Sequence, residues 1–339
     1  MVIPYYDLNA VQSEYLQEMQ DAAASVISSG NYISTTNSFE PLFAEYVGAQ
    51  YCIGTNSGTS SLQLALAALG IGLGDEVITV AHTFKATAAA IIHAGATPVY
   101  VDIDDTFTMD ASKIEEAITK RTKCILPVHL YGNVAPMKEI MKIAKEHSLY
   151  VIEDCAQAHG SKLDGKHVGT FGDVGCFSFY PGKGLGACGD AGAVVCNDEA
   201  LYNKMFKMHS YGEGCIGFNF RMDVLQAEIL KVKLKYFPEI LKKKQEIAGE
   251  YNKHFHDVSV REGVEHSYHI YPILIDNREK FIEERKNKLE LRMHYETPVH
   301  KTKGYQQPCY LPVTEQISSR QVSVPIYPGV DYKKIIELL

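Results

Sequence analysis

Short β-branched runs alternate with alanine- and leucine-rich stretches of helical period from residue 51 onward. This alternation predicts a mainly parallel sheet with helices on both faces, because each parallel connection needs a helix-sized crossover. Strands are expected at 51–53, 76–80, 98–102, 124–128, 150–153, 175–179 and 193–196, and helices at 62–69, 85–93, 112–117, 137–146 and 201–209. The sequence therefore predicts a doubly wound α/β domain.

The pattern changes after residue 223. A helical pattern runs to about residue 255 with a break at Pro238, and a strand at 266–275, a charged helix at 278–289 and a turn-rich tail with a short helix follow. This order of elements is typical of a smaller α+β domain. We expect a large domain over 1–235, with an N-terminal arm, and a small C-terminal domain over 236–339.

The composition argues against nucleic-acid binding. The 339 residues are 46% hydrophobic and 22% charged with a net charge of −8, which is ordinary for a soluble enzyme and gives no basic field. The one basic stretch comprises Lys231, Lys233, Lys235 and then Lys242, Lys243 and Lys244. It is either a contact for a polyanion or, as we interpret it, a solvated helix face.

The eight cysteines are scattered without a C-x-x-C pair, so reduced thiols are expected and neither a disulfide scaffold nor a metal site is indicated. The sequence also has no secretory signal pattern and no uncharged apolar run of 18 residues. We expect a cytoplasmic protein without membrane contact.

A lysine follows the predicted strand 175–179 after one turn, in Ser178-Phe-Tyr-Pro-Gly-Lys183. Proline and glycine end the strand there and would present the amine at a fixed point, where partial desolvation makes it a Schiff-base former. The next segment, Gly184-Leu-Gly-Ala-Cys-Gly189, matches G-x-G-x-x-G. Because it leads into a strand instead of opening a helix, it argues against a dinucleotide-binding fold.

Two other segments lie at the ends of predicted strands. Gly54-Thr-Asn-Ser-Gly58 and Thr59 put small residues where a helix begins, which makes either an anion site or an ordinary helix cap. Asp154 follows the buried strand 150–153, at the edge where open α/β sheets bind ligands. It is either a ligand-binding carboxylate or the partner of a helix N-terminus or a lysine. Gln157 would reach the same ligand.

Four motifs occur in the order and spacing of one enzyme family: Pro127-Val-His-Leu-Tyr-Gly132, Ile152-Glu-Asp-Cys-Ala-Gln-Ala-His-Gly160, Ser178-Phe-Tyr-Pro-Gly-Lys183 and Gly217-Phe-Asn-Phe-Arg-Met-Asp223. Over nearly its whole length the chain resembles the pyridoxal-phosphate (PLP) dependent sugar aminotransferases of the DegT/StrS type. The resemblance implies the type I aminotransferase fold, with a mainly parallel seven-stranded sheet in the large domain and a small C-terminal α+β domain. It also implies PLP as the cofactor.

The resemblance assigns roles around the cofactor ring. Lys183 is expected to hold PLP covalently and to shuttle a proton once released. Asp154 is expected to keep the pyridine nitrogen protonated, so that the ring acts as an electron sink. Gln157 should bond the phenolic oxygen of the ring, and Phe84 should stack on the ring face.

The resemblance also implies a shared active site. The residues of the same chain expected to bind the phosphate are Gly58, Thr59 and Ser178. In the family a phosphate contact comes from across the interface, so Asn219 of the partner subunit is expected to complete the site in a homodimer. Arg221 and His300 are expected near the substrate, although His300 is equally compatible with a surface loop.

The stretch after Lys183 looks closer to members that aminate a 3-keto nucleotide sugar than to members that act at C4. Amination of a 3-keto-6-deoxy nucleotide sugar by an amino acid, glutamate, is therefore the expected activity. The chain departs from the family at Gly184, at residues 34–38, in a shortened 212–217 loop and in its trimmed C-terminal domain. These departures leave a smaller keto acceptor open, such as a sugar phosphate or a cyclitol. A PLP-binding sensor or scaffold without turnover is the alternative from another class, and the intact Lys183 and Asp154 disfavour it.

Overall fold

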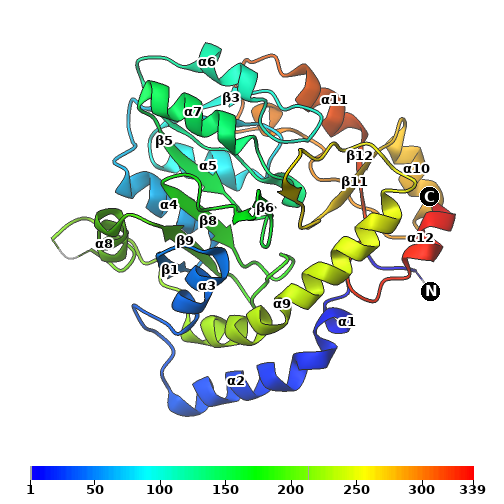
Figure 1. The fold of residues 1–339 in the computed structure, drawn as a ribbon, viewed down its shortest axis with the longest axis horizontal. Helices are drawn as coiled ribbons and strands as arrows, with labels where there is room; N and C mark the ends of the chain where they lie inside the picture. Colours follow the sequence, from blue (N-terminus) through cyan, green and yellow to red (C-terminus); the bar gives the residue numbers. More distant parts are fainter. Residues whose placement is uncertain (1, 213) are drawn as a thin grey trace.

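A seven-stranded sheet lies at the centre of the computed structural model, which describes residues 2–212 and 214–339 (Figure 1). In spatial order its strands are β1 (Tyr51–Thr55), β9 (Gly192–Cys196), β8 (Val174–Ser178), β5 (Tyr150–Asp154), β4 (Thr122–Ile125), β2 (Glu76–Val80) and β3 (Thr97–Val101). The pairs from β3 across β2, β4 and β5 to β8 are parallel, and β9 pairs antiparallel with both β8 and β1. The predicted α/β fold is confirmed.

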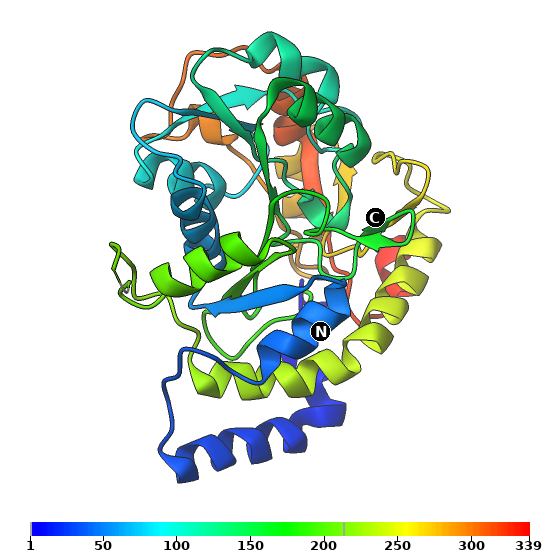
Figure 2. The same cartoon turned by 60° about the vertical axis from the view of Figure 1, so that its left-hand side comes forward.

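Helices cover both faces of this sheet. Figure 2 shows α4 (Gly58–Ala68), α5 (Ala86–His93) and α8 (Glu199–Met208) on one side, and α3 (Phe39–Val47) and α9 (Val224–Tyr251) on the other. α4 begins four residues before its predicted start, because the Ser57 hydroxyl accepts a 3.1 Å hydrogen bond from the Ser60 N–H and caps the first turn. α7 (Met137–His147) buries Met137, Ile140 and Ala144, which lie on one helical face.

The helix break predicted at Pro238 is wrong, because α9 continues through this residue to Tyr251. An internal proline removes one backbone hydrogen bond and crowds the carbonyl four residues earlier, at a cost of about 3 kcal/mol. Burial offsets this cost: Phe237 packs in the core of the sheet domain, and Tyr251 packs in the C-terminal core. The expected domain boundary at 235/236 falls inside α9 and stays a prediction.

The C-terminal part is built around a two-stranded antiparallel sheet of β11 (Tyr271–Leu274) and β12 (Gln321–Val324). Its helices are α10 (Arg278–Arg285), α11 (Pro312–Arg320) and α12 (Tyr332–Leu338). The strand predicted at 266–275 is shorter than expected, because residues 266–270 pack against the sheet domain instead, where the Ser267 N–H donates to the Gly132 carbonyl at 3.2 Å.

The remaining elements are short or lie at the N-terminus. They are α1 (Leu8–Gln12), α2 (Leu16–Ser29), α6 (Ile114–Ala117) and a small sheet of β10 (Val264–Glu265), β6 (Lys162–Leu163) and β7 (Lys166–His167). α2 lies along α9 at the bottom of Figure 1. Before α1 the chain reaches the C-terminal part, where Ile3 exchanges backbone hydrogen bonds with Lys288 and Glu290, each 2.9 Å long.

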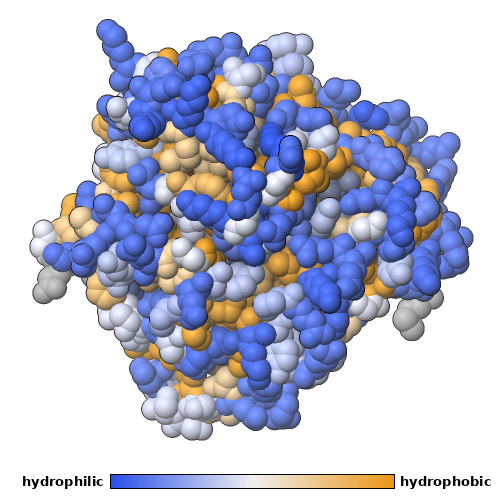
Figure 3. Space-filling view, in the orientation of Figure 1, coloured by the Kyte–Doolittle hydropathy of each residue, from blue (hydrophilic) through white to orange (hydrophobic). Residues whose placement is uncertain are grey.

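The surface is mostly polar on the face drawn in Figure 3, with hydrophobic residues in small patches. Scattered apolar residues of this kind are normal for a folded chain. None of the helices in residues 2–212 and 214–339 combines the length and the apolar character needed to span a bilayer.

Candidate active site

A cavity of about 570 Å³ opens at the carboxyl ends of β5 and β8, the edge where ligands bind in open α/β sheets. Residues from the loops after β1 and β2, from the N-terminal arm and from the C-terminal part complete its wall. Seven residues predicted from the sequence line it: Gly58, Thr59, Phe84, Asp154, Gln157, Ser178 and Lys183. The fold thus brings together segments that lie up to 125 positions apart in the chain.

The N-terminus of α4 forms one end of the cavity. The N–H groups of Gly58 and Thr59 belong to the first helical turn, whose N–H groups have no intrahelical partners and carry the positive end of the helix dipole. Gly58 lies so close to β8 that a Cβ there would approach the Ser178 Cβ to 2.5 Å. The backbone therefore comes near the Ser178 hydroxyl, and the set of donors suits a phosphate group.

Asp154 is the last residue of β5, and only 5% of its surface is exposed. Its carboxylate accepts hydrogen bonds from the Thr87 hydroxyl at 2.9 Å and from the Ala156 N–H at 3.1 Å. Burial raises the pKa of Asp154, and the Lys183 charge opposes this shift. A cationic group in the cavity would stabilise the carboxylate, because a buried charge without a counter-charge is costly.

Lys183 lies five residues beyond the end of β8, in a turn closed by a 2.8 Å hydrogen bond from its own N–H to the Tyr180 carbonyl. Burial lowers the pKa of its amine to about 8, although the Asp154 charge opposes the shift. The amine is therefore partly unprotonated near neutral pH and can act as a nucleophile. Lys85, the other lysine beside a predicted site residue, is exposed and does not line the cavity.

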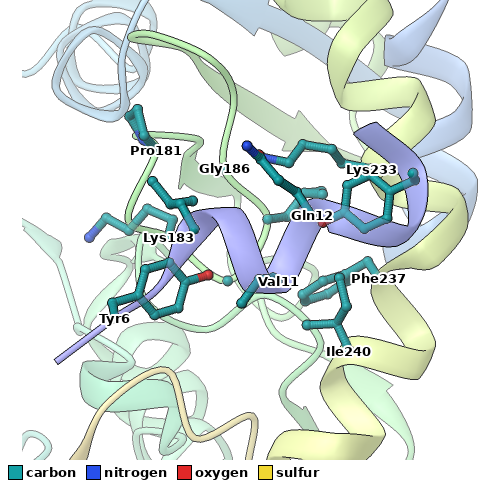
Figure 4. Close-up of a pocket in the computed structure, with 13 residues that line it drawn as sticks. Tyr6, Val11, Gln12, Pro181, Lys183, Gly186, Lys233, Phe237 and Ile240 are labelled. Atoms are coloured by element: carbon teal, nitrogen blue, oxygen red, sulfur yellow. The ribbon is translucent and has the colours of Figure 1, made fainter. Parts of the chain in front are cut away.

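The turn that carries Lys183 is backed by two other elements. Figure 4 shows Lys183 beside α1, with Tyr6 of the N-terminal arm close by and Lys233 and Phe237 of α9 on the far side of the helix. The space between these elements is a cleft of about 10 Å³, room for one water molecule. The arm and α9 therefore restrict the lysine loop from behind.

The side-chain amide of Gln157 is oriented by two contacts. Its oxygen accepts from the Tyr131 N–H at 2.9 Å, and its nitrogen donates to the Tyr295 hydroxyl at 2.8 Å. One amide hydrogen of Gln157 remains for a ligand. Tyr131 adopts a φ of 61°, which is uncommon for a bulky residue and marks a place where the surrounding structure holds the backbone. The rings of Phe84 and Tyr295 lie 6.0 Å apart.

Glu153, which precedes Asp154 in β5, is completely buried, and its carboxylate accepts several hydrogen bonds. Its carboxylate faces His129 at 3.0 Å and accepts backbone N–H bonds at 2.7–2.8 Å from Gly169, Phe171 and Gly172. Burial opposes ionisation, but these bonds lower the pKa of Glu153 overall. The other imidazole nitrogen of His129 accepts from the Ala135 N–H at 3.1 Å. All hydrogen-bonding atoms of the two side chains therefore have partners, and none is free to bind a metal ion.

Glu153→Ala is expected to lower the free energy of unfolding by about 3–5 kcal/mol, because it leaves His129 and the three N–H groups buried without a partner. Urea denaturation measures this loss. Glu146→Ala, at an exposed position of α7, is the control and should change stability by less than about 0.5 kcal/mol. Equal stability of the two variants would contradict the structural role of Glu153.

Three predicted site residues do not line the cavity of their own chain. Asn219 is exposed, and its backbone carbonyl accepts from the Asn56 side chain at 3.1 Å. Arg221 donates to the Ser210 hydroxyl at 2.7 Å. His300 is buried, not on the surface, and faces the Glu315 carboxylate at 3.2 Å. The roles of these three residues stay predictions. In the shortened 212–217 loop, residue 213 lies outside the described residues.

Sequence reasoning missed part of the cavity wall. The missed residues with polar side chains include Tyr5, Thr87, Lys244, His269, Arg292, His294 and Tyr295. Thr87 lies three residues after Phe84, in a segment for which only the aromatic ring was assigned a role. Most of the others come from the arm and the C-terminal part, outside the four motifs. The basic stretch on α9 also needs a correction: Lys233 and Lys244 are buried, so it is not a solvated face along its whole length. Lys233 and Lys244 lie at helical spacing from buried Phe237, and this spacing is the sequence signal that could have distinguished them from the exposed lysines of the stretch.

The cavity combines a helix N-terminus, a buried carboxylate and an amine of lowered pKa. These groups fit a phosphorylated cationic ring with an amine-reactive aldehyde, which is the chemistry of PLP. With the mainly parallel seven-stranded sheet, they define the class of type I PLP-dependent aminotransferases.

The chain belongs to the DegT/DnrJ/EryC1/StrS aminotransferase family, whose profile matches residues 10–339. It is 42% identical over 352 residues to the dTDP-3-amino-3,6-dideoxy-alpha-D-galactopyranose transaminase of Aneurinibacillus thermoaerophilus, covering 98% of this chain and 97% of that protein. The solved structure of S. venezuelae DesV with a ketimine intermediate superposes with a TM-score of 0.95 at 34% identity, covering 99% of this chain and 97% of that chain.

A second solved structure concerns the cofactor. NtdA from Bacillus subtilis, with bound cofactor PMP, has a TM-score of 0.89 at 31% identity and covers 99% of this chain and 83% of its own. The predicted family, fold, enzyme class and cofactor are confirmed: the protein is a PLP-dependent sugar aminotransferase.

Proposed function

We propose that the protein transfers the amino group of L-glutamate to the 3-keto group of a 6-deoxy nucleotide sugar. The observation that carries the amino-transfer chemistry is the presence of the Lys183 amine and the Asp154 carboxylate in one cavity. The 3-amino-3,6-dideoxy sugar in the name of the A. thermoaerophilus relative supports the acceptor. The segment that follows Lys183 supports the same position of amination.

Each residue of the cavity has a separate role in binding the cofactor or moving a proton. When bound, PLP supplies an electron sink for charge that develops at the substrate carbon. Lys183 holds the cofactor and, once released, moves a proton at that carbon. Asp154 holds the proton on the ring nitrogen, and Gln157 donates to the phenolic oxygen. Phe84 orients the ring by stacking. Gly58, Thr59 and Ser178 bind the phosphate at the α4 N-terminus.

The acceptor can be tested by product analysis. The enzyme is incubated with 2-oxoglutarate and a panel of amino sugars, and mass spectrometry identifies which amino sugar is converted to its keto form. The panel includes 3-amino and 4-amino nucleotide sugars, an amino sugar phosphate and an amino cyclitol. We expect conversion of a dTDP- or UDP-linked 3-amino sugar. Conversion of the sugar phosphate or the cyclitol alone would replace the proposed acceptor with a smaller one.

We also propose that two chains share each active site, with the Asn219 side chain of one protomer reaching the phosphate in its partner. Asn219 is exposed and stays out of its own cavity. Two aromatic residues of the cavity wall, Phe84 and Tyr180, are 50% and 57% exposed, which leaves apolar area for a partner to cover. A homodimer therefore suits this site better than a monomer.

Mixing two inactive variants tests the shared site. Lys183→Ala and Asn219→Ala homodimers should each be inactive, or nearly so. After subunit exchange, one of the two sites in each mixed dimer has both residues, so up to about a quarter of wild-type activity should return, since half of the dimers are mixed. Native mass spectrometry follows the exchange. Proven exchange without recovered activity would show that each chain builds its own site.

A further inference from the structure

The cavity contains a second buried lysine that the proposed mechanism does not use. Lys244 lies on α9 with only 5% of its surface exposed, and it lines the same cavity as Lys183. Its amine donates to the His269 carbonyl at 3.2 Å. An ammonium group has three hydrogens, so two remain available for a ligand in the cavity.

Lys244 differs from the other cations of the cavity because it has no counter-charge. Arg292 pairs with Glu290, and the Lys183 amine is influenced by the Asp154 carboxylate. In residues 2–212 and 214–339, no carboxylate forms an ion pair with Lys244, and burial alone lowers its pKa, to about 7. A buried amine without a partner is costly in its charged form, and perturbed groups of this kind concentrate at functional sites.

Lys244 shares its cavity with Lys183 and His269, and its amine bonds the His269 carbonyl. The charges of Lys183 and Lys244 both lower the pKa of His269, and both also lower the pKa of His159, after the larger effect of burial. The two amines therefore act on the same imidazoles. A group bound to Lys244 would therefore occupy the same cavity as the Lys183 amine.

We propose that Lys244 binds the α-carboxylate of the amino-acid donor. The inference rests on the proposed function, which supplies an amino acid as one substrate. Only this substrate has a full negative charge one bond from the reacting carbon. The charges of a nucleotide sugar lie on its phosphates, several bonds from C3. Two free N–H groups match the two oxygens of a carboxylate.

The test compares the holoenzyme with Lys244→Met, which keeps the length of the side chain and removes its charge, and with Lys244→Arg, which keeps the charge. Lys242→Met is the matched control, because Lys242 is exposed on the same helix. Calorimetric titration with glutarate measures carboxylate binding without reaction. Stopped-flow absorbance measures the two half-reactions separately, one with L-glutamate and one with a nucleotide 3-amino sugar. Thermal melting reports folding.

We expect Lys244→Met to weaken glutarate and L-glutamate binding by about 10- to 100-fold, the loss of a charge-assisted hydrogen bond. The amino-sugar half-reaction should stay within about twofold of wild type, and the melting temperature should not fall, because an unpaired buried amine is removed. Lys244→Arg should recover part of the binding, and Lys242→Met should behave as wild type.

Three results would overturn the inference. One is unchanged glutarate and L-glutamate binding in Lys244→Met, and another is an equal loss in both half-reactions. The third is a fall in melting temperature without recovery of binding in Lys244→Arg, which would indicate a structural role. If the wild type reacts with no amino acid at all, the proposed function fails as well, and this outcome is visible before any variant is made.

Discussion

Lys183→Ala is expected to yield a folded protein that no longer attaches PLP covalently and loses transamination by a factor on the order of 10⁴ or more, since both the anchor and the proton carrier are removed. The wild-type protein should be yellow. Borohydride reduction followed by a tryptic map should place the cofactor on the peptide that contains Lys183. The physical reason is the lowered pKa of the Lys183 amine, which the turn after β8 presents to the cavity that Asp154 also lines.

Lys85→Ala is the control for this experiment, because Lys85 adjoins Phe84 but is exposed. It should retain the colour and the labelled peptide. The pH dependence gives a second check. The unprotonated amine attaches the cofactor, and with a pKa of about 8 its fraction rises about fivefold between pH 7 and pH 8 and levels off above about pH 9. Label on Lys85, or an attachment rate that still rises at pH 10, would remove the assignment of Lys183.

Asp154→Asn is expected to retain the cofactor and to lose transamination by on the order of 10²–10⁴-fold, which corresponds to about 3–5 kcal/mol in the barrier. The amide keeps the shape of the carboxyl group but removes the negative charge. Its oxygen can still accept from the Ala156 N–H, and its nitrogen can donate to the Thr87 hydroxyl, which reverses the direction of that bond. A neutral partner no longer keeps a proton on the ring nitrogen, so the electron sink weakens. Single-turnover kinetics with L-glutamate measure the loss.

Asp190→Asn is the matched control, since Asp190 is another carboxylate of the cavity wall and is exposed. The cofactor reaction with L-glutamate should stay within about tenfold of wild type in this variant. Near-normal turnover in Asp154→Asn, or an equal loss in both variants, would contradict the specific role of Asp154.

The sheet could be predicted from the sequence because its strands are covered on both faces. Strands such as β2 and β9 are buried along their whole length, and β9 appears as a continuous run of small and apolar residues, Gly192-Ala-Val-Val-Cys196. The ends of helices were less predictable, since they depend on single hydrogen bonds such as the cap at Ser57. Pro238 and residues 266–270 were predicted incorrectly because tertiary packing overrode the local preference.

Some residues of the candidate site could likewise be predicted from the sequence, and others could not. Asp154 and Ser178 end strands, and Gln157 and Lys183 follow within five residues. Parallel strands bring their carboxyl ends to one edge, so local motifs were enough to group these residues. Thr87, Lys244 and Tyr295 share no motif with these residues. Lys244 belongs to a lysine run in which its exposed neighbour Lys242 has the same side chain. Helical spacing from buried Phe237 separates the two, but the packing of α9 decides that this face is buried.

The sequence by itself determined the alternation of strands and helices, the turn that presents Lys183 and the motifs shared with a family of aminotransferases. These are local properties, set by the period of apolar residues and by glycine and proline. The tertiary structure decided which distant side chains complete the cavity, which charges are left without a partner and how far each pKa shifts. Such quantities depend on burial and on distances between segments that are remote in the chain, and no short stretch of sequence contains them.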